Sequence, residues 1–337
     1  MKKRLLLTGI GGFIGSHFLA HFMEKTDWEI VGTDSFRHKG LTDRVHIVMK
    51  DHPKWKPRLQ IFTHDLTAPF SEQLITRIGK IDYIINMASE SHVQRAIEEP
   101  EYFIKNNIFL MLVMLEYARK IKPKAFVQIS TDEVYGAAPK GKRHKEWSTI
   151  LPSNPYSASK AAQEAIAISY WRTYKLPIII TNTMNNFGEM QDPEKYPALI
   201  LRHLMKDKMV PIHGGKAGVK GSRVYMHAKN HADAVLFILK NTKPYTHQDG
   251  CIDYPDRYNI VGEKELENLE LAKLIAKLVN KPLTYKKFDY HAIRPGHDRR
   301  YGLDGTKLKK LGWKAPISLI EGLKQTIGWT LKNKGWL

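Results

Sequence analysis

The chain has 337 residues, of which 42% are hydrophobic and 26% are charged, values that fit a globular protein and exclude a fibrous or disordered one. Its single cysteine, Cys251, excludes a disulfide framework and a multi-cysteine zinc site within the chain. Lysine and arginine outnumber aspartate and glutamate by 53 to 34, which gives a formal net charge of +19 and favours an anionic partner.

The first predicted element is a buried strand at residues 4–8, followed by a glycine cluster and a helical pattern from Ile14 to Met23. The three leucines of this strand are too few for the apolar core of a signal peptide. No later apolar run approaches the roughly 18 residues of a membrane span. Together with the single cysteine, these features predict a cytoplasmic protein.

Further apolar strands alternate with amphipathic helices through the first half of the chain. The predicted strands are 28–33, 59–62, 83–86, 125–130 and 178–182, and the predicted helices are 103–119 and about 157–173. Strands that are apolar throughout belong to a parallel sheet covered on both faces. We therefore expect an α/β protein with a Rossmann-type, doubly wound parallel sheet.

After Asn186 the chain becomes rich in proline, glycine and lysine, and regular patterns are shorter. The alternating stretch 223–226 and the helix 232–239 are interpreted as returns to the sheet. A helix through 271–278, a loop at 294–297 and a helix near 320–331 predict a smaller C-terminal lobe. The expected division is 1–185 with about 222–262 for the dinucleotide-binding domain, and 186–221 with 263–337 for the lobe.

The glycine cluster lies between the first strand and the first helix. Gly9, Gly12 and Gly15 at this position permit a tight turn, close approach of a pyrophosphate and close helix packing. Asp34, 19 residues after Gly15 at the end of the second strand, can accept hydrogen bonds from both ribose hydroxyls and would repel a 2′-phosphate. This pattern predicts NAD; alternatively Asp34 caps a turn, and the nearby Arg37 leaves some tolerance of NADP.

Two pairs of polar residues indicate chemistry at the same edge of the sheet. Tyr156 and Lys160 are four residues apart at the start of a helix, where an ammonium group can lower the pKa of a phenol. Asp132 and Glu133 follow the fifth strand, and two carboxylates suit an elimination, which needs one base and one acid. Alone, each pair is explained by surface contacts or a solvated turn; their common location favours catalysis.

The glycine turn, Asp34 and the Tyr156/Lys160 pair resemble the extended short-chain dehydrogenase/reductase superfamily. Within it the chain resembles the nucleotide-sugar 4,6-dehydratases, and the similarity covers nearly the whole chain. The segments that carry this resemblance are Ala88-Ser89-Glu90-Ser91-His92-Val93, Ser130-Thr131-Asp132-Glu133-Val134-Tyr135-Gly136, Asn154-Pro155-Tyr156-Ser157-Ala158-Ser159-Lys160, Asn185-Asn186-Phe187-Gly188, Pro193-Glu194-Lys195 and Arg294-Pro295-Gly296-His297-Asp298-Arg299-Arg300.

The resemblance implies an NAD-dependent lyase that converts a nucleoside-diphosphate-glucose to the 4-keto-6-deoxy sugar. Tyr156, assisted by Lys160, would take the proton of the 4-hydroxyl, which Thr131 would hold, while NAD takes the C4 hydride. Glu133 would remove the C5 proton, Asp132 would protonate the departing 6-hydroxyl, and the hydride would return to C6. The expected substrate is dTDP-glucose, with UDP-glucose or another base as alternatives.

The resemblance also implies binding residues. The cofactor residues are Gly9, Gly12, Phe13, Ile14, Gly15, Asp34, Ser35, Phe36, Arg37, Asp65, Leu66, Met87, Ala88, Ser89, Glu90, Asn106, Tyr156, Lys160 and Asn186. The substrate residues are Ser91, Thr131, Asn185, Lys195, Tyr196, Pro211, His213, Arg223, Asn259, Arg294 and His297. Without the family pattern, Arg223 and Arg294 would be surface ion-pair members and Asn259 a strand-end cap.

The sequence departs from the family in three places. Gln94 stands where the family usually has aspartate, Val224-Tyr225 where it usually has Asp-Trp, and the basic segment 36–55 does not follow the usual pattern. These departures leave open the nucleotide base and the hexose. The other functions considered are an NAD-dependent 4-epimerase or C6 decarboxylase, and a non-catalytic dinucleotide-binding protein with a polyanion-binding surface; the intact acid and Tyr/Lys pairs argue against both.

Metal, nucleic acid and membrane partners are not expected. The histidine pairs His17/His21 and His227/His231 have helical spacing but lack a third ligand of a zinc motif. The basic residues are dispersed rather than clustered as in nucleic-acid modules. A homodimer through a four-helix bundle is expected, with apolar faces on the helices 103–119 and 157–173.

Overall fold

The computed structural model describes residues 2–37, 40–214, 220–251, 253–289, 296 and 298–337. Its largest element is a seven-stranded sheet with the order β10-β6-β5-β4-β1-β2-β3, in which every pairing is parallel. The strands are β1 (Arg4–Thr8), β2 (Glu29–Asp34), β3 (Leu59–Thr63), β4 (Tyr83–Asn86), β5 (Ala125–Thr131), β6 (Ile178–Thr183) and β10 (Asp256–Ile260). This confirms the Rossmann-type α/β fold.

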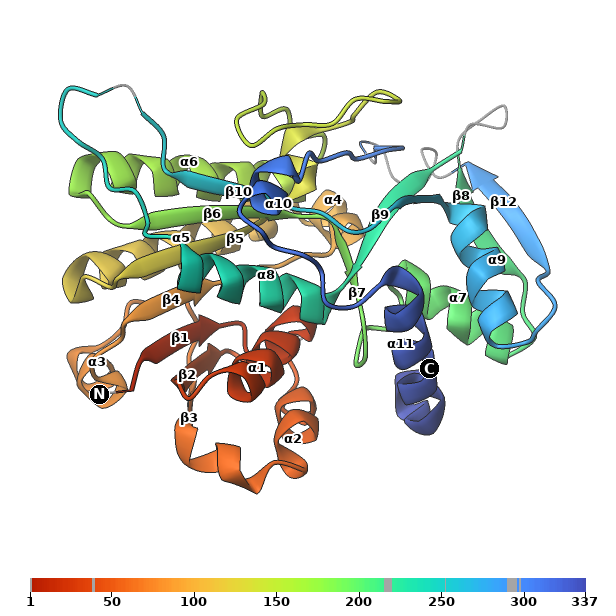
Figure 1. Ribbon diagram of the computed structural model, residues 1–337, viewed down its shortest axis with the longest axis horizontal. Coiled ribbons are helices and arrows are strands. Elements are labelled where there is room, and N and C mark those ends of the chain that lie inside the picture. The colour runs from red at the N-terminus through yellow and green to blue at the C-terminus, as the bar shows by residue number, and fades with distance from the viewer. Residues whose placement is uncertain (1, 38–39, 215–219, 252, 290–295, 297) are drawn as a thin grey trace.

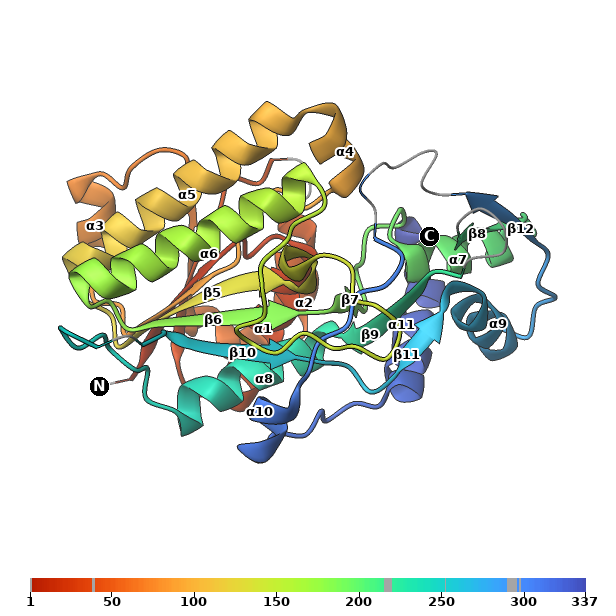
Figure 2. The ribbon, with the colours of Figure 1, turned by 90° about the horizontal axis from the view of Figure 1, so that it is seen from above.

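Helices cover both faces of this sheet (Figures 1 and 2). One face is covered by α1 (Phe13–Lys25), α2 (Thr42–Lys50) and α8 (Ala228–Asn241), and the other by α3 (Glu72–Ile78), α5 (Pro100–Ile121) and α6 (Pro155–Tyr174). Side chains alternate between the faces along a strand, so Leu5 and Leu7 pack in one core and Leu6 in the other. Burying each such leucine stabilises the fold by about 1.5–3 kcal/mol.

A smaller lobe lies beyond the carboxyl ends of the strands, at the right of Figure 1. It has a three-stranded sheet of order β11-β9-β7 and a two-stranded sheet of β12 and β8. Its elements are β7 (Asn185–Phe187), β8 (Val210–Gly214), β9 (Ser222–His227), β11 (Glu265–Glu267), β12 (Tyr285–Asp289), α7 (Tyr196–Met205), α9 (Asn268–Leu278) and α11 (Leu319–Lys332). The remaining short elements are α4 (Val93–Glu98), α10 (Thr306–Lys310), η1 (Pro53–Arg58), η2 (Asp132–Tyr135) and η5 (Lys334–Trp336).

The expected return of residues 223–226 to the main sheet is wrong. These residues belong to β9, which pairs with β7 and β11 in the lobe. The helix that follows, α8, does return and packs against α1 in the main core. The main sheet gains its seventh strand from β10, next to β6. The predicted division of the chain into two domains stays a prediction.

Strand β10 escaped the sequence analysis because it is largely polar. Its Arg257 is fully buried and forms an ion pair of 2.8 Å with the fully buried Glu164 of α6. The Arg257 guanidinium also lies 4.2 Å from the ring centre of Trp147. A buried charge pair of this kind replaces the apolar side chains by which a central strand is recognised in a sequence.

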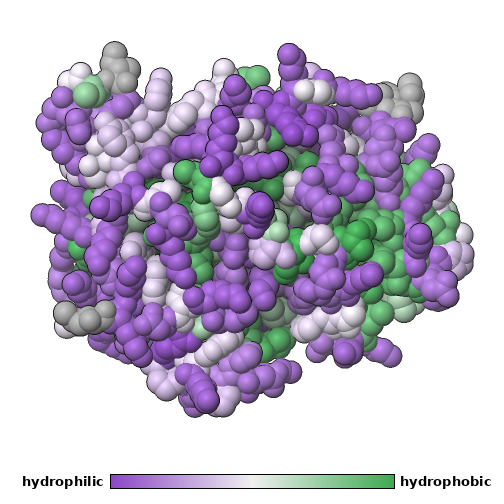
Figure 3. Space-filling model, in the orientation of Figure 1, coloured by the Kyte–Doolittle hydropathy of each residue, from purple (hydrophilic) through white to green (hydrophobic). Residues whose placement is uncertain are grey.

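The face of the molecule shown in Figure 3 is largely hydrophilic, with hydrophobic side chains gathered toward the lobe. None of the helices in the described residues is long and apolar enough to cross a membrane. The net charge of +19 attracts anions without specifying a fold.

A buried histidine in the main core makes the fold sensitive to acid. His231 of α8 packs edge-on against Phe18 of α1, with ring centres 5.0 Å apart, and neither ring nitrogen has a hydrogen-bond partner within the described residues. Burial lowers the pKa of His231 from 6.5 to about 3. At pH values between about 3 and 6.5, the His231 side chain is therefore protonated in the unfolded chain and neutral in the folded chain. The free energy of unfolding is therefore expected to fall as the pH drops below 6.5, by about 1.4 kcal/mol per pH unit for this group.

The substitution His231→Leu tests this expectation. Leucine removes the titrating group, so the free energy of unfolding, measured by urea titration at a series of pH values, should fall less steeply between pH 6 and pH 4 by about 1.4 kcal/mol per unit. The exposed His46 of α2 is the site of the control substitution His46→Gln. A wild-type slope in His231→Leu would contradict the assignment.

Candidate active site

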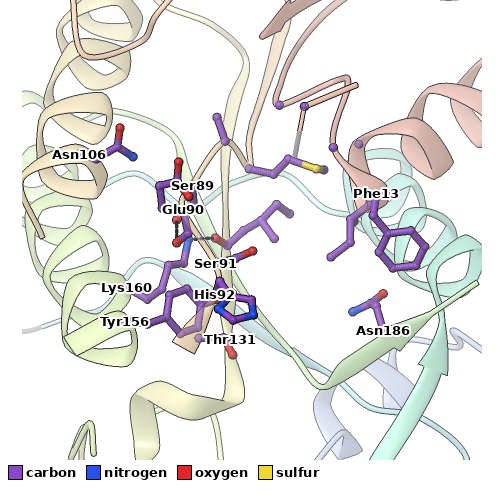
Figure 4. A pocket seen from close by; sticks show the side chains of 18 of the residues that line it. Phe13, Ser89, Glu90, Ser91, His92, Asn106, Thr131, Tyr156, Lys160 and Asn186 are labelled. Carbon is purple, nitrogen blue, oxygen red and sulfur yellow. Dashed lines mark hydrogen bonds between the residues drawn. The ribbon is translucent and has the colours of Figure 1, made fainter. Parts of the chain in front are cut away.

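A cavity of about 600 Å³ lies at the carboxyl ends of β1, β4, β5 and β6, the edge at which open parallel sheets bind ligands. The glycine turn, the segments after β4 and β5, the first turn of α6 and the residues after β6 line it. Figure 4 shows Phe13 and Asn186 on one side of this cavity and Tyr156 with Lys160 on the other. The structure thus joins the predicted cofactor turn and the predicted catalytic pair in one space.

The turn after β1 has a geometry that only glycine permits. Gly9 has a φ of 71°, and a Cβ on it would lie 3.1 Å from the Cα of Ala88. A Cβ on Gly15 would lie only 2.0 Å from the carbonyl oxygen of Gly9. The N-cap of α1 is Gly12, which offers no side-chain cap. The first amides of α1 therefore remain available at the cavity wall, where a pyrophosphate binds.

Asp34 lies at the end of β2 and lines the same cavity. Its carboxylate accepts hydrogen bonds from the backbone N–H of Gly11 and of Phe36, both at 2.9 Å. Burial raises the Asp34 pKa, and these backbone bonds oppose the increase. Arg37, which was considered for NADP, forms an ion pair of 2.8 Å with Asp65.

Nearly all of the other predicted cofactor residues also line the cavity. These are Phe13, Ile14, Ser35, Arg37, Asp65, Leu66, Met87, Ala88, Ser89, Glu90, Asn106 and Asn186. Phe36 differs, because its ring packs against Gly11 and the main core instead of facing the cavity. A Cβ on Gly11 would lie 2.8 Å from that ring. Phe36 therefore supports the glycine turn from behind.

The two predicted acids follow Thr131 at the end of β5. The hydroxyl of Thr131 donates to Asp132 Oδ1 at 3.1 Å. Glu133 Oε2 accepts hydrogen bonds from Asn154 Nδ2 at 3.4 Å and from the Tyr301 hydroxyl at 3.3 Å. Burial, followed by the charge of Glu133, raises the Asp132 pKa to about 7.

Glu133 also has a raised pKa, because burial outweighs the opposing charge of Arg223 and the hydrogen bond from Asn154. Two acids with different environments can divide the roles of base and acid between them. The pKa near 7 suits Asp132 to hold a proton at neutral pH and to donate it.

Tyr156 is placed by the N-terminus of α6. Asn154 caps this helix in a reciprocal capping box with Ser157, and Pro155 occupies the first turn. Lys160, one turn later, donates to the carbonyl of Ile129 and to Gln163 Oε1, both at 2.7 Å. Burial lowers the Lys160 pKa to about 8.

The expected lowering of the Tyr156 pKa is not found in the protein by itself. Burial and the charges of Glu133 and Asp132 raise this pKa well above its ordinary value, and the hydrogen bond with Thr131 opposes the increase only in part. The ammonium of Lys160 points to Ile129 and Gln163. Lowering of the Tyr156 pKa therefore requires neutralisation of the acids or a further positive charge.

Four residues that line the cavity each have a buried side-chain oxygen without a hydrogen-bond partner among the described residues. The atoms are Ser130 Oγ, Asp132 Oδ2, Asn186 Oδ1 and Gln191 Oε1. A buried polar atom without a partner costs about 1–3 kcal/mol.

The predicted substrate residues divide into three groups. Ser91, Thr131, Asn185 and Lys195 line the cavity. Tyr196, Pro211, His213, Arg223 and Asn259 are not among the lining residues. Arg294 and His297 lie outside the described residues.

Two members of the second group have clear structural contacts. Asn259 is fully buried, and its Nδ2 donates to the carbonyls of His144 and Asp304, so this amide nitrogen is engaged within the protein; its contact with a substrate stays a prediction. The guanidinium of Arg223 donates to the carbonyls of Ser222, Asp298 and Arg299. It also opposes the rise in the pKa of both acids. Arg223 therefore lies behind the acid pair.

The lining residues that were missed as contacts include His92, Gln191, Asp192 and Glu194. His92 Nε2 lies 3.5 Å from Glu194 Oε1, so two walls of the cavity meet there. His92 and Glu194 belong to segments that carry the family resemblance, which could have identified them. Gln191 and Asp192 occupy a loop whose polar composition gives no such signal.

Two members of the helically spaced histidine pairs, His17 and His227, lie near one another in the structure. Within the described ranges no group of three or more His, Cys, Asp or Glu side chains could hold a metal ion. His17 and His227 do approach one another, with ring centres 5.6 Å apart. The contact partner of both is Glu189, at 3.0 Å from its carbonyl oxygen to His17 Nε2 and 3.1 Å from its carboxylate to His227 Nε2.

Known proteins match this chain over its full length. The family model described as GDP-mannose 4,6 dehydratase matches residues 6–326. A dTDP-glucose 4,6-dehydratase from Shigella flexneri is 32% identical over 99% of this chain and 94% of its own length.

Solved structures give the same result. A dTDP-glucose 4,6-dehydratase from Streptomyces venezuelae with NAD bound superposes with a TM-score of 0.85 at 32% identity, covering 99% of this chain and 98% of that chain. A UDP-glucose 4-epimerase from Thermus thermophilus in complex with NAD has a TM-score of 0.82 at 24% identity over 97% of this chain and 98% of that chain. At that identity the epimerase shows the fold alone.

Proposed function

Because the chain belongs to the GDP-mannose 4,6-dehydratase family of nucleotide-sugar dehydratases, we propose that it is an NAD-dependent lyase that dehydrates a nucleoside-diphosphate-glucose. The proposed product is the 4-keto-6-deoxy sugar, and dTDP-glucose is the proposed substrate. The relatives named dTDP-glucose 4,6-dehydratase and the NAD in their structures support this assignment.

One observation carries the proposal most directly. Asp132 and Glu133 lie at the end of β5 in the same cavity as Tyr156 and Lys160. Oxidation of a sugar hydroxyl needs only the Tyr/Lys pair, whereas elimination of water also needs an acid and a base. The presence of both pairs at one sheet edge fits a dehydratase and exceeds what an epimerase requires.

The residues present fit NAD. A Cβ on Gly15 would collide with the Gly9 carbonyl, so glycine is what allows the tight turn, and the uncapped end of α1 suits the pyrophosphate. The Asp34 carboxylate at the end of β2 suits a ribose with free hydroxyls and disfavours a 2′-phosphate. When bound, NAD would accept the hydride from C4 and return it to C6.

The chain's own residues would act at three atoms of the sugar. Tyr156 would take the proton of the 4-hydroxyl, and Thr131, which is in hydrogen-bond contact with Tyr156, would hold that oxygen. The resulting 4-ketone would make the C5 proton acidic. Glu133 would then remove this proton, and Asp132 would give its own proton to the 6-hydroxyl, which leaves as water. Glu133 would return a proton to C5 as the hydride returns to C6, and the proton gained by Tyr156 balances the one lost by Asp132.

The charge states agree with these roles. A protonated Asp132, favoured by its pKa of about 7, removes one of the two negative charges that raise the Tyr156 pKa. The same proton is then in place for the leaving hydroxyl. One side chain thus supports both the oxidation and the elimination.

The proposal is tested by incubating the protein with a panel of nucleotide-activated glucoses and recording product masses. A product lighter than the substrate by one water is expected, with dTDP-glucose giving the highest rate. UDP-xylose is the control, because a pentose lacks the 6-hydroxyl and cannot lose water by this route. Products of unchanged mass from every glucose would indicate an epimerase and contradict the proposal.

A homodimer through α5 and α6 is also proposed. The two helices lie side by side on one face of the sheet (Figure 2), and the Phe109 side chain of α5 is 52% exposed. Phe103 and Leu115 of α5 are fully buried in the monomer core and cannot contact a partner. The half-buried Ile104, Ile108 and Leu112, with the exposed Phe109, remain as the apolar face of α5.

A cytoplasmic location stays a prediction from the sequence. The choice of thymine as the nucleotide base rests on the relatives named dTDP-glucose 4,6-dehydratase. Most of the +19 charge has no role in the proposed site, and binding of nucleic acid is not part of the proposed function.

A further inference from the structure

The loop that follows β7, residues 188–195, forms one wall of the active-site cavity and is called the cavity loop below. Gln191, Asp192, Glu194 and Lys195 of this loop line the cavity. Its conformation is irregular, and Met190 adopts a φ of 60°, a left-handed conformation that costs a residue other than glycine about 1–3 kcal/mol. Surrounding contacts must therefore hold the loop in place.

The main anchor of the cavity loop is Arg44 of α2, a fully buried arginine. Its Nε donates to the carbonyl of Met190 at 3.1 Å, and its Nη1 donates to the carbonyl of Gly11 at 3.2 Å. Its Nη2 lies 3.2 Å from Asp192 Oδ2. The Arg44 guanidinium thus connects the glycine turn, through Gly11, to the two residues that flank Gln191, which are Met190 and Asp192.

The surroundings of Arg44 increase the strength of these bonds. The guanidinium carbon lies 5.2 Å from the ring centre of Trp336, so the C-terminal turn η5 covers it. Hydrogen bonds and ion pairs gain strength where water is excluded. The neighbouring Glu189 is held independently, by His17 of α1 and His227 of β9.

Arg44 also controls the charge of the cavity wall. Asp192 lines a space that is lined for a dinucleotide and a nucleoside diphosphate, both of which carry negative charge. The ion pair with Arg44 neutralises this carboxylate. Without Arg44 the Asp192 carboxylate would lose this ion pair beside the diphosphates.

We propose that Arg44 is a positioning residue that couples the cofactor turn to the substrate side of the active site through the cavity loop. It holds the loop at a fixed distance from Gly11 and keeps Asp192 neutralised, so that Asn186 and Lys195 face the bound ligands. This proposal rests on the proposed function for the nature of those ligands. Arg44 itself does not line the cavity.

The test compares the purified full-length variants Arg44→Met, Arg44→Lys, Asp192→Asn and the double variant Arg44→Met/Asp192→Asn with the wild type. The NAD content after gel filtration and the Kd of dTDP by calorimetry are the readouts, so dehydration is not needed. Arg44→Met should lose most of its NAD and bind dTDP at least about tenfold more weakly. Arg44→Lys should weaken dTDP binding about threefold, because lysine keeps the ion pair but not both carbonyl bonds.

The double variant and a second arginine separate positioning from general stability. Removing the carboxylate should recover part of the dTDP affinity lost in Arg44→Met, and Asp192→Asn alone should change it by less than about threefold. Arg58 is the matched control, because its guanidinium also donates to three carbonyls, those of Met23, Thr26 and Trp28, far from the cavity lining. Arg58→Met should lower the unfolding temperature but keep NAD and dTDP binding.

Wild-type NAD content and dTDP affinity in Arg44→Met would overturn the proposal, as would an equal loss of both ligands in Arg58→Met. If Arg44→Met does not fold, the Arg44→Lys variant tests the proposal instead. Wild-type binding of NAD and dTDP by Arg44→Lys would likewise overturn the proposal. Failure of the wild-type protein to bind dTDP would contradict the proposed substrate, and the NAD content would still test the role of Arg44.

Discussion

The substitution Glu133→Gln is expected to abolish formation of the 4-keto-6-deoxy sugar, with a loss of about 10²–10⁴-fold in kcat, while NAD stays bound. Glutamine keeps the shape of the side chain and can still accept the bonds from Asn154 and Tyr301 through its amide oxygen. It cannot accept the C5 proton. Since Tyr156 is intact, addition of substrate should still produce the absorbance of NADH, which then accumulates.

Asp132→Asn provides the informative comparison, because the two acids have different proposed roles. In D₂O the wild-type protein should incorporate deuterium into the product. Asp132→Asn should return substrate labelled at C5, since Glu133 still exchanges the proton but water is not expelled. Glu133→Gln should return unlabelled substrate. Undiminished turnover in Glu133→Gln, or the reverse pattern of labelling, would contradict the assigned roles.

The sequence contains enough information for the main sheet because its strands are marked by their hydrophobicity. Both faces of β1 are buried, so it reads as an unbroken apolar run, and its alternate residues enter the two cores. The glycine turn was recognisable for a similar reason, since its backbone tolerates no side chain on Gly15. At these positions, the residue types that form the local sequence pattern are also those that the packing of the fold requires.

Pairing partners were harder to predict than the elements. The alternating pattern of β9 identifies a strand but carries no information about its neighbours, and β9 joins β7 and β11 in the lobe. In β10 the informative apolar residues are partly replaced by Arg257, whose charge is neutralised by Glu164 from a distant part of the chain. The two members of such an ion pair meet only in the folded protein, so the local sequence around either of them does not reveal the pair.

The same reason explains which parts of the site were missed. Arg44 lies on a short helix in a basic segment, where an arginine would normally face solvent. Its partners are Gly11, Met190 and Asp192, which lie before it and far after it in the chain. Asp192 was missed for a related reason. The role of a carboxylate in a loop depends on the cation that it contacts, and the sequence of the loop does not identify that cation.

The catalytic tyrosine gives the second large prediction. Tyr156→Phe keeps the ring at the start of α6 but removes the hydroxyl, which is in contact with Thr131. Both the substrate-dependent NADH signal and the final product should fall by about 10²–10⁴-fold, because the first proton transfer precedes every later step. In D₂O no label should enter the returned substrate. This separates Tyr156→Phe from Glu133→Gln, in which the NADH signal remains.

Tyr135→Phe is the matched control for Tyr156→Phe. Tyr135 is also buried near the end of β5, but its hydroxyl donates to the carbonyl of Glu146 at 2.8 Å and is not part of the cavity lining. Its loss should cost about 1 kcal/mol of stability and leave the NADH signal unchanged.

Since burial and the two acids raise the pKa of Tyr156, the wild-type rate of NADH formation should increase with pH as that hydroxyl loses its proton. A Tyr156→Phe variant that forms NADH at the wild-type rate would show that another group takes the proton of the 4-hydroxyl.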